Sequence, residues 1–228
     1  MLKLFIVLIA GYAIADFLVC THRIQAITEK YQFSIVSSAI HAIITYAVLQ
    51  VWLCWQIPLL IFLIHFLIDL LIHHRSADST AAFIVCKSTH IVGLFAASLL
   101  LAGTGWITGF TGTGYLLLVQ VAGFIGTVQG SGQLIDRFTS KIKETNNLVI
   151  NGLAGGGKLI GELERMLIFL FIFIGYPAGI GFLVAAKSIL RFEEAKKQKL
   201  AEYVLIGTLL SFSMAIVGAS VTKWATEL

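Results

Sequence analysis

Long apolar runs separated by short polar stretches dominate the chain. They predict helices of membrane-spanning length, because about 20 apolar residues at 1.5 Å per residue cross the hydrocarbon core of a bilayer. A lone segment in lipid must also satisfy its own backbone hydrogen bonds, which a helix does. The runs cover residues 3–21, 34–56, 58–74, 81–102, 111–129, 163–187 and 203–222. The pattern therefore predicts an all-α, polytopic helical membrane protein.

The run at 163–187 is interrupted at its centre by the residues GYPAG at 175–179. Proline and clustered glycine break or kink a helix, and each half of about 12 residues spans only about 18 Å, too little to cross a bilayer. A single kinked span would give seven spans. A re-entrant hairpin would give six transmembrane helices plus a broken pair, and it keeps the basic loops at 130–162 and 188–202 on one side. The positive-inside rule favours the hairpin, with both termini outside and the basic loops cytoplasmic.

The alternation of apolar and polar stretches predicts three parts. Residues 1–129 form a five-helix membrane domain with histidines and aspartates inside its spans. Residues 130–162 form a cytoplasmic linker whose middle predicts a short surface helix. Residues 163–228 hold the broken hairpin and the last transmembrane helix.

The composition supports a membrane location and argues against other classes. The chain is 58% apolar and 12% charged, with a mean hydropathy of +0.92, whereas an ordinary soluble domain has about 25% charged residues. The net charge of +4 comes mostly from the two basic loops, which indicates membrane topology rather than nucleic-acid binding. Cys20, Cys54 and Cys86 lie far apart and provide neither a disulfide framework nor a paired-cysteine metal motif.

Ionisable side chains lie inside the predicted spans at two matching depths. His65 and Asp69 are four residues apart and therefore share one face of their helix. Alternation of the first four spans places two carboxylates and an amine about 6–9 Å deep, and three imidazoles about 12–14 Å deep. The shallower layer comprises Asp16, Asp69 and Lys87, and the deeper layer comprises His41, His65 and His90. Ionisable groups within a membrane usually face a partner or a water-filled cavity, so both layers are candidate sites.

The histidine layer suggests a metal centre. Three imidazoles from three helices suit zinc or another divalent metal, which often keeps a fourth position open for water. In this hypothesis His41, His65 and His90 are the metal ligands, while Asp16 or Asp69 acts as the catalytic base or orients the ligands. The corresponding function is a metal-dependent membrane hydrolase that acts on a lipid headgroup or another cytoplasm-accessible ester.

Two other functions use the same residues differently. An ion or proton channel or transporter would pass its cargo through the cluster, with the broken segment at Tyr176-Pro177 as a gate. A membrane scaffold or effector would use the cluster only for stability, with Lys87 paired to a carboxylate, and would have no catalysis. The expected partners are the lipid bilayer and either a second copy of the chain or another membrane protein, and not nucleic acid.

A glycine-rich segment at 152–158 has the glycine and lysine spacing of a P-loop. The Ser or Thr that would bind magnesium is replaced by Leu159, and the pattern provides no α/β sheet to hold the loop. The segment is better interpreted as a flexible entry to the helix that begins near Lys158.

Two groups of residues form recognisable motifs. The first group comprises Asp16-Phe17-Leu18, Lys30, His41, His65-Phe-Leu-Ile-Asp69 and His90. The second comprises GKLIGELERMLIFL at 157–170, GFLVAAKSILRF at 181–192 and AEYVLIGTLLSF at 201–212. Together they resemble a bacterial family of multi-pass membrane proteins known only as a domain of unknown function, with the tail often attached to it. The resemblance implies a protein of the bacterial inner (cytoplasmic) membrane and brings no activity with it.

The N-terminal half is also distantly similar to membrane-bound proteins labelled as metal-dependent hydrolases. The similarity is carried by the placement of histidine and aspartate and is an analogy, so the function must be argued from the site. The chain departs from the expected pattern before His90, where Cys86-Lys87 replace an Asp-Gln pair. Because a cation stands where a carboxylate is expected, this departure weakens the case for a metal ion.

Overall fold

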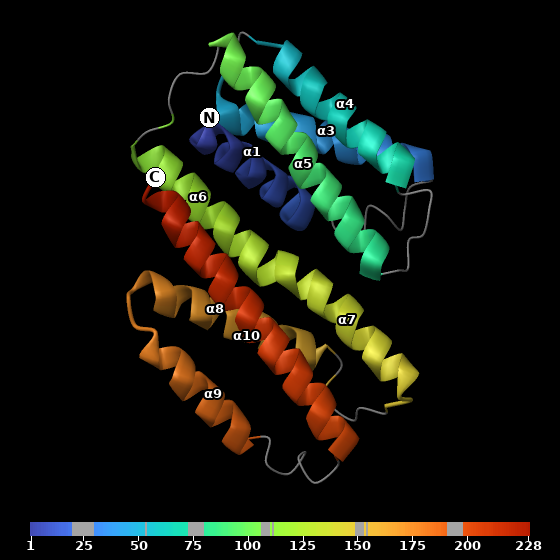
Figure 1. Ribbon diagram of the computed structural model, residues 1–228, viewed down its shortest axis with the longest axis vertical. Coiled ribbons are helices and arrows are strands. Elements are labelled where there is room, and N and C mark those ends of the chain that lie inside the picture. Colours follow the sequence, from blue (N-terminus) through green and yellow to red (C-terminus); the bar gives the residue numbers. More distant parts are fainter. Residues whose placement is uncertain are drawn as a thin grey trace. The chain divides into compact units, whose positions relative to one another are not determined.

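The computed structural model describes residues 1–19, 30–52, 54–72, 80–105, 110, 112–148, 153, 155–190 and 198–228. Every secondary-structure element within these ranges is helical, which confirms the all-α prediction (Figure 1). The predicted loop at 188–202 and the glycine-rich segment at 152–158 lie partly outside the described residues.

Five of the described helices are long and apolar enough to cross a membrane. They coincide with five of the apolar runs in the sequence. These helices are α1 (Leu2–Ile14) with its π-helical continuation η1 (Ala15–Val19), α3 (Lys30–Leu49), α5 (Thr80–Thr104), α6 (Thr113–Ile125) continued through η2 (Gly126–Gly130) and α7 (Ser131–Thr145), and α10 (Gln198–Thr226). The apolar helices α4 (Gln56–Ile72) and α9 (Ala178–Leu190) are shorter.

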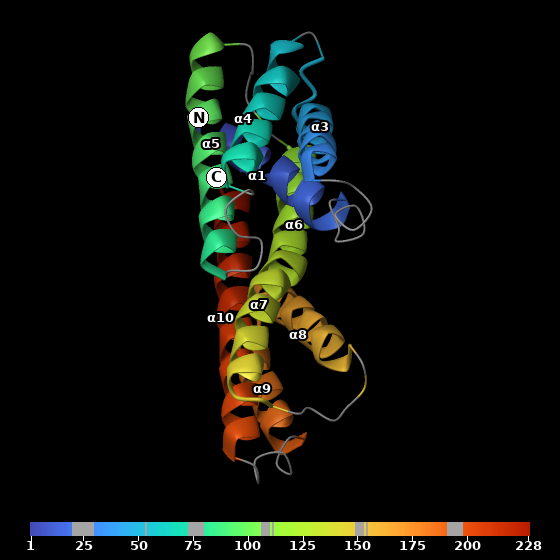
Figure 2. The same ribbon diagram turned by 90° about the vertical axis from the view of Figure 1, so that its right-hand side faces the viewer.

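The first of two compact units comprises Met1–Ile125. Its central helix is α1, which packs against α3, α5 and α6, while α4 packs against both α3 and α5 (Figures 1 and 2). A Cβ atom added to Gly11 would lie 3.0 Å from the Oγ1 of Thr45, so this glycine lets α1 and α3 approach closely. Gly93 likewise lets α5 approach α4, because a Cβ atom added to it would lie 2.9 Å from the Cγ2 of Ile64. These close contacts bring the polar side chains of four helices together.

The second unit comprises Gly126–Glu227 and contains η2, α7, α8 (Gly156–Phe173), α9 and α10. Here α10 packs against α7 and α8, and α9 packs against α8. The core is formed by Ile168, Phe212 and Ala215, which are buried. The division between the units falls after Ile125, so the segment at 130–162, which the sequence suggests is a linker, contributes α7 to the second unit.

The break between α8 and α9 has a defined local structure. Gly175 adopts a φ of +74°, and its N–H donates to the carbonyl of Ile172, while the N–H of Tyr176 donates to the carbonyl of Phe171 at 2.8 Å. These two bonds form a Schellman motif, which caps the helix and requires a residue that tolerates a left-handed conformation. Pro177 then prevents the helix from continuing. The two helices therefore turn back on each other as a hairpin.

Candidate functional site

The predicted site residues gather in the first unit, on four helices that pack together. Helix α1 and its continuation contribute Asp16, α3 contributes His41, and α4 contributes His65 and Asp69. Helix α5 contributes Lys87 and His90, and also Cys86. His41, His65 and His90 are buried, and the ion-pairing side chains beside them are largely buried.

The three histidines form a stack. The ring centroids of His41 and His65 lie 4.3 Å apart with an interplanar angle of 22°, and those of His65 and His90 lie 4.7 Å apart at 31°. The ring of Tyr12 lies against all three, with centroid distances of 5.2, 5.5 and 5.7 Å. The structure thus brings the deeper layer together. The sequence argument missed Tyr12, although its position four residues before Asp16 on one helix was a usable signal.

Backbone carbonyls fix the orientation of the two outer imidazoles. The Nδ1 of His41 donates to the carbonyl of Ser37 at 2.8 Å, and the Nδ1 of His90 donates to the carbonyl of Cys86 at 2.9 Å. A carbonyl can only accept, so in both rings the proton sits on Nδ1 and the neutral ring leaves a lone pair on Nε2. Metal-binding histidines commonly use their second nitrogen in this way. The Nε2 of His65 is buried and has no hydrogen-bond partner among the described residues.

The carboxylates of the shallower layer have different partners. The Nζ of Lys87 donates to the Oδ2 of Asp16 at 2.5 Å, and the Oδ1 of Asp16 lies 4.0 Å from the Nε2 of His41. Asp69 instead faces His90, with 3.4 Å between Oδ1 and Nε2. The layer therefore divides into a Lys87–Asp16 pair beside His41 and an Asp69 carboxylate beside His90.

The position of Lys87 bears on the replacement of an Asp-Gln pair by Cys86-Lys87, which weakened the case for a metal ion. Its charge is compensated by Asp16, and its Nζ also lies 5.4–5.7 Å from the ring centroids of Tyr12, Phe17 and Phe83. Cation–π contacts at such distances stabilise an ammonium group in an apolar setting. Lys87 is thus already compensated on the Asp16 side of the cluster, so it argues less strongly against a metal ion at Asp69.

Asp69, Cys86 and His90 are close enough to hold a metal ion. One potential ligand atom from each lies within 4.8 Å of the other two, which makes them the candidate metal group among the described residues. Two ligands at about 2.0–2.1 Å from a tetrahedral ion are separated by about 3.4 Å. The 3.4 Å between the Asp69 Oδ1 and the His90 Nε2 fits this separation. The Sγ of Cys86 lies 3.7 Å from the Nδ1 of the His90 ring.

The three-histidine ligand set fits a single ion less well. The lone pair of an imidazole nitrogen lies in the plane of its ring, so ligands of one ion must have ring planes that meet at that ion. His41 and His65 are stacked nearly parallel instead. Cys86 was not among the metal ligands that the sequence suggested, although it is four residues from His90 on one helix face and so offered a signal.

Comparison of the chain with protein-family models, with curated proteins and with solved structures finds no match. Its function must therefore be argued from the geometry and chemistry of the site.

Proposed function

We propose that the chain is an integral membrane protein with six transmembrane helices, a re-entrant hairpin at α8–α9, and both termini outside. The five long apolar helices support this proposal, and α4 would be the sixth span. Large apolar side chains are exposed along these elements, among them Leu100 (64%), Val217 (61%), Phe182 (77%) and Ile189 (75%). Exposing so much apolar surface to water costs free energy, and the hydrocarbon of a bilayer would cover it instead. The resemblance to a bacterial family would place the protein in the inner membrane.

We further propose that the first unit binds a divalent transition metal ion through Asp69, Cys86 and His90. The observation that carries the proposal is the approach of the Asp69 Oδ1 to the His90 Nε2. Both are acceptors when His90 is neutral, because its one ring proton is then donated from Nδ1 to the Cys86 carbonyl. Two acceptors that face each other in a buried site are stabilised by a metal ion or a proton between them, and the nearby Cys86 favours a metal ion. Nitrogen, oxygen and sulfur ligands together favour zinc over calcium or magnesium.

The site chemistry favours hydrolysis of an ester as the activity. A zinc-like ion with three protein ligands supplies an activated water at neutral pH. Asp16 is the candidate base, because Lys87 holds its Oδ2 in place while its Oδ1 faces the cluster beside His41. Asp69, the second catalytic candidate from the sequence, acts as a ligand in this arrangement. The substrate would be a lipid headgroup or another ester that reaches the cytoplasmic side of the cluster.

The metal proposal is tested by elemental analysis of the full chain purified in detergent. We expect near-stoichiometric metal in the wild type and loss of most of it in Cys86→Ser. Cys54→Ser is the matched control, since Cys54 is also a free, partly buried cysteine but lies outside the cluster. Release of a fatty acid or headgroup from mixed lipid micelles, abolished by a chelator, would support hydrolysis. A metal-free wild type would overturn the metal and hydrolase proposals together.

A second candidate function is proton passage, and one observation favours it. Asp16, His41, His65, His90 and Asp69 form a continuous row, with a carboxylate at each end and three stacked rings between. Such rows of ionisable groups are used as proton relays in membranes. A proton shared between His90 and Asp69 would also relieve the contact between two acceptors. Proton flux into liposomes that contain a metal-free wild type would favour this function over hydrolysis. If the protein shows neither bound metal nor proton flux, the scaffold function is favoured instead.

A further inference from the structure

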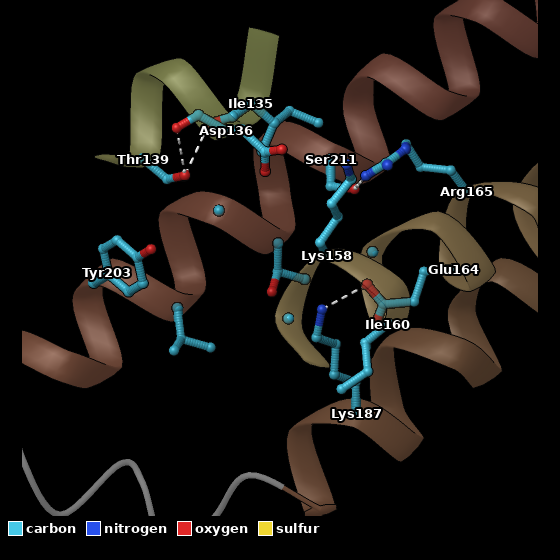
Figure 3. Close-up of a pocket in the computed structure, with 15 residues that line it drawn as sticks. Ile135, Asp136, Thr139, Lys158, Ile160, Glu164, Arg165, Lys187, Tyr203 and Ser211 are labelled. Carbon is cyan, nitrogen blue, oxygen red and sulfur yellow. Dashed lines mark hydrogen bonds and ion pairs between the residues drawn. The ribbon is translucent and has the colours of Figure 1, made fainter. Parts of the chain in front are cut away.

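The second unit contains a pocket of about 220 Å³ that is separate from the histidine cluster. It lies among α7, α8, α9 and α10, and its lining includes three cationic side chains, Lys158, Arg165 and Lys187 (Figure 3). Two carboxylates, Asp136 and Glu164, also line it. The charges of these side chains decide which ligand the pocket suits.

Arg165 is the most unusual of them. Its side chain is only 3% exposed, yet within the described part of the chain no carboxylate oxygen lies within 4.0 Å of its guanidinium. It donates from Nε to the carbonyl of Val128 at 2.9 Å and from Nη1 to the Oγ of Ser211 at 3.2 Å. Both partners are neutral, and a guanidinium has five N–H donors. Among the described residues, this buried positive charge therefore has donors without partners and no anion in direct contact.

Two glycines make room for this guanidinium. A Cβ atom on Gly132 would lie 2.8 Å from the Nη2 of Arg165, and one on Gly161 would lie 3.1 Å from Nη1. A larger residue at either position would displace the side chain. The guanidinium is thus held in one place from α7 and α8, as a binding group that is positioned before its ligand arrives.

The remaining charges leave the pocket cationic. The Nζ of Lys187 donates to the Oε2 of Glu164 at 2.6 Å, so these two charges compensate each other. Lys158 is exposed in the first turn of α8, where the N–H groups of the helix start add positive potential. Asp136 is exposed like Lys158, so solvent and salt screen both charges, and the buried Arg165 remains as the less screened cation. The hydroxyl groups of Thr208 and Tyr203 supply further polar atoms at the pocket wall.

We propose that this pocket binds a phosphate group carried by a phospholipid headgroup or by a soluble phosphate ester. The fixed guanidinium of Arg165 provides planar donors that match phosphate oxygens, and Lys158 adds a mobile ammonium at the mouth. Basic pockets between membrane helices on the cytoplasmic side recognise anionic headgroups, and the proposed topology puts the start of α8 on that side. Gly157, in the first turn of α8, also lines the pocket beside Lys158. The proposal does not depend on the metal site.

The test uses the full chain in detergent and measures binding by native mass spectrometry and by the shift in melting temperature. The probes are phosphatidylglycerol, the phosphate-free diacylglycerol, and sn-glycerol 3-phosphate. We expect phosphatidylglycerol to bind and diacylglycerol not to bind. Lys158→Gln should weaken phosphate binding about tenfold, a loss that corresponds to about 1.4 kcal/mol. Lys143→Gln is the matched control, because it removes another exposed lysine, on α7, that does not line the pocket.

The outcomes separate the two sources of phosphate. Binding of phosphatidylglycerol that depends on Lys158, without binding of sn-glycerol 3-phosphate, would identify a lipid headgroup. Lys158-dependent binding of both probes would identify a site for soluble phosphate esters as well. Equal binding to the Lys158→Gln and Lys143→Gln proteins, or no binding of either phosphate probe, would overturn the proposal.

Discussion

The Nε2 of His90 lies 3.4 Å from the Oδ1 of Asp69, across the contact between α5 and α4. The other nitrogen of the same ring donates to a carbonyl one turn earlier on α5. The ring is therefore anchored to its own helix on one side and offers a lone pair to a neighbouring helix on the other. This arrangement suits a group that shares a cation, whether a metal ion or a proton.

The two possible ligand sets share His90, to which one adds Asp69 and Cys86 and the other adds His41 and His65. If Cys86 is a ligand, the cobalt-substituted protein should show the ultraviolet charge-transfer absorption of a cobalt–thiolate bond, and Cys86→Ser should remove it. His41→Gln should leave both this band and the metal content unchanged. Loss of metal from His41→Gln with retention in Cys86→Ser would instead support the three-histidine set.

The pairing of Lys87 with Asp16 predicts a specific rescue. Lys87→Met leaves the Asp16 carboxylate without its cation in a largely buried position, so we expect a loss of about 1–3 kcal/mol in stability, below the full cost of breaking a completely buried pair. Adding Asp16→Asn should recover part of this loss in thermal unfolding in detergent. Adding Asp69→Asn should not, because Asp69 contacts His90. Equal rescue by both variants would show that the two carboxylates act as one cluster.

His65 distinguishes proton passage from metal binding. It occupies the middle of the row of ionisable groups but lies outside the candidate metal group. His65→Gln should therefore leave bound metal unchanged. If the row conducts protons, the same variant should abolish flux measured with a pH-sensitive dye enclosed in liposomes. Flux that survives this substitution would exclude the stacked histidines as the proton path.

Two glycines of α10 predict opposite responses to one substitution. A Cβ atom on Gly218 would lie 2.5 Å from the Oγ1 of Thr127 and 3.2 Å from its Cβ, whereas one on Gly207 would lie 3.6 Å from Thr139. Gly218→Ala should destabilise the protein by about 1–3 kcal/mol through overpacking. Gly207→Ala should be neutral or slightly stabilising, because alanine favours a helix by about 1 kcal/mol over glycine. Thermal unfolding of the two variants provides the comparison, and equal stability would contradict it.

The hairpin predicts which parts of the chain share a side of the membrane. Cysteines introduced at Lys143 and Lys199, in a background without native cysteines, should both be protected from an impermeant thiol reagent added outside. Labelling of only one of them would show that the segment between crosses the bilayer.

The sequence predicted the helices well, because long apolar runs and a glycine–proline break leave few alternatives. Counting residues along the spans also placed His41, His65 and His90 at similar depths, and the structure brings their rings together. Depth does not specify direction around a helix axis. For that reason the sequence left open whether Lys87 pairs with Asp16 or Asp69.

Other features were outside the reach of the pattern. The polar composition after residue 130 predicts a linker with a short surface helix, and it does not reveal that the helix in this stretch continues from α6 through η2 to Thr145. The burial of Arg165 has no signal in its local sequence, because the space that Gly132 provides comes from another helix. Contacts of this kind depend on packing between distant segments.

The π-helical turns η1 and η2 each contain five residues, one beginning just before Asp16 and the other containing Val128. A π-turn holds one more residue than the equivalent α-helical turn, so it arises from a single-residue insertion. Removing one residue from either turn would convert it into a regular α-helical turn and would nearly preserve the register of the flanking helix, whereas a deletion elsewhere in the helix would rotate everything beyond it by about 100°. Within the helices, single-residue length changes among descendants of this sequence should therefore concentrate at 15–19 and 126–130, where the rest of the helix keeps its contacts.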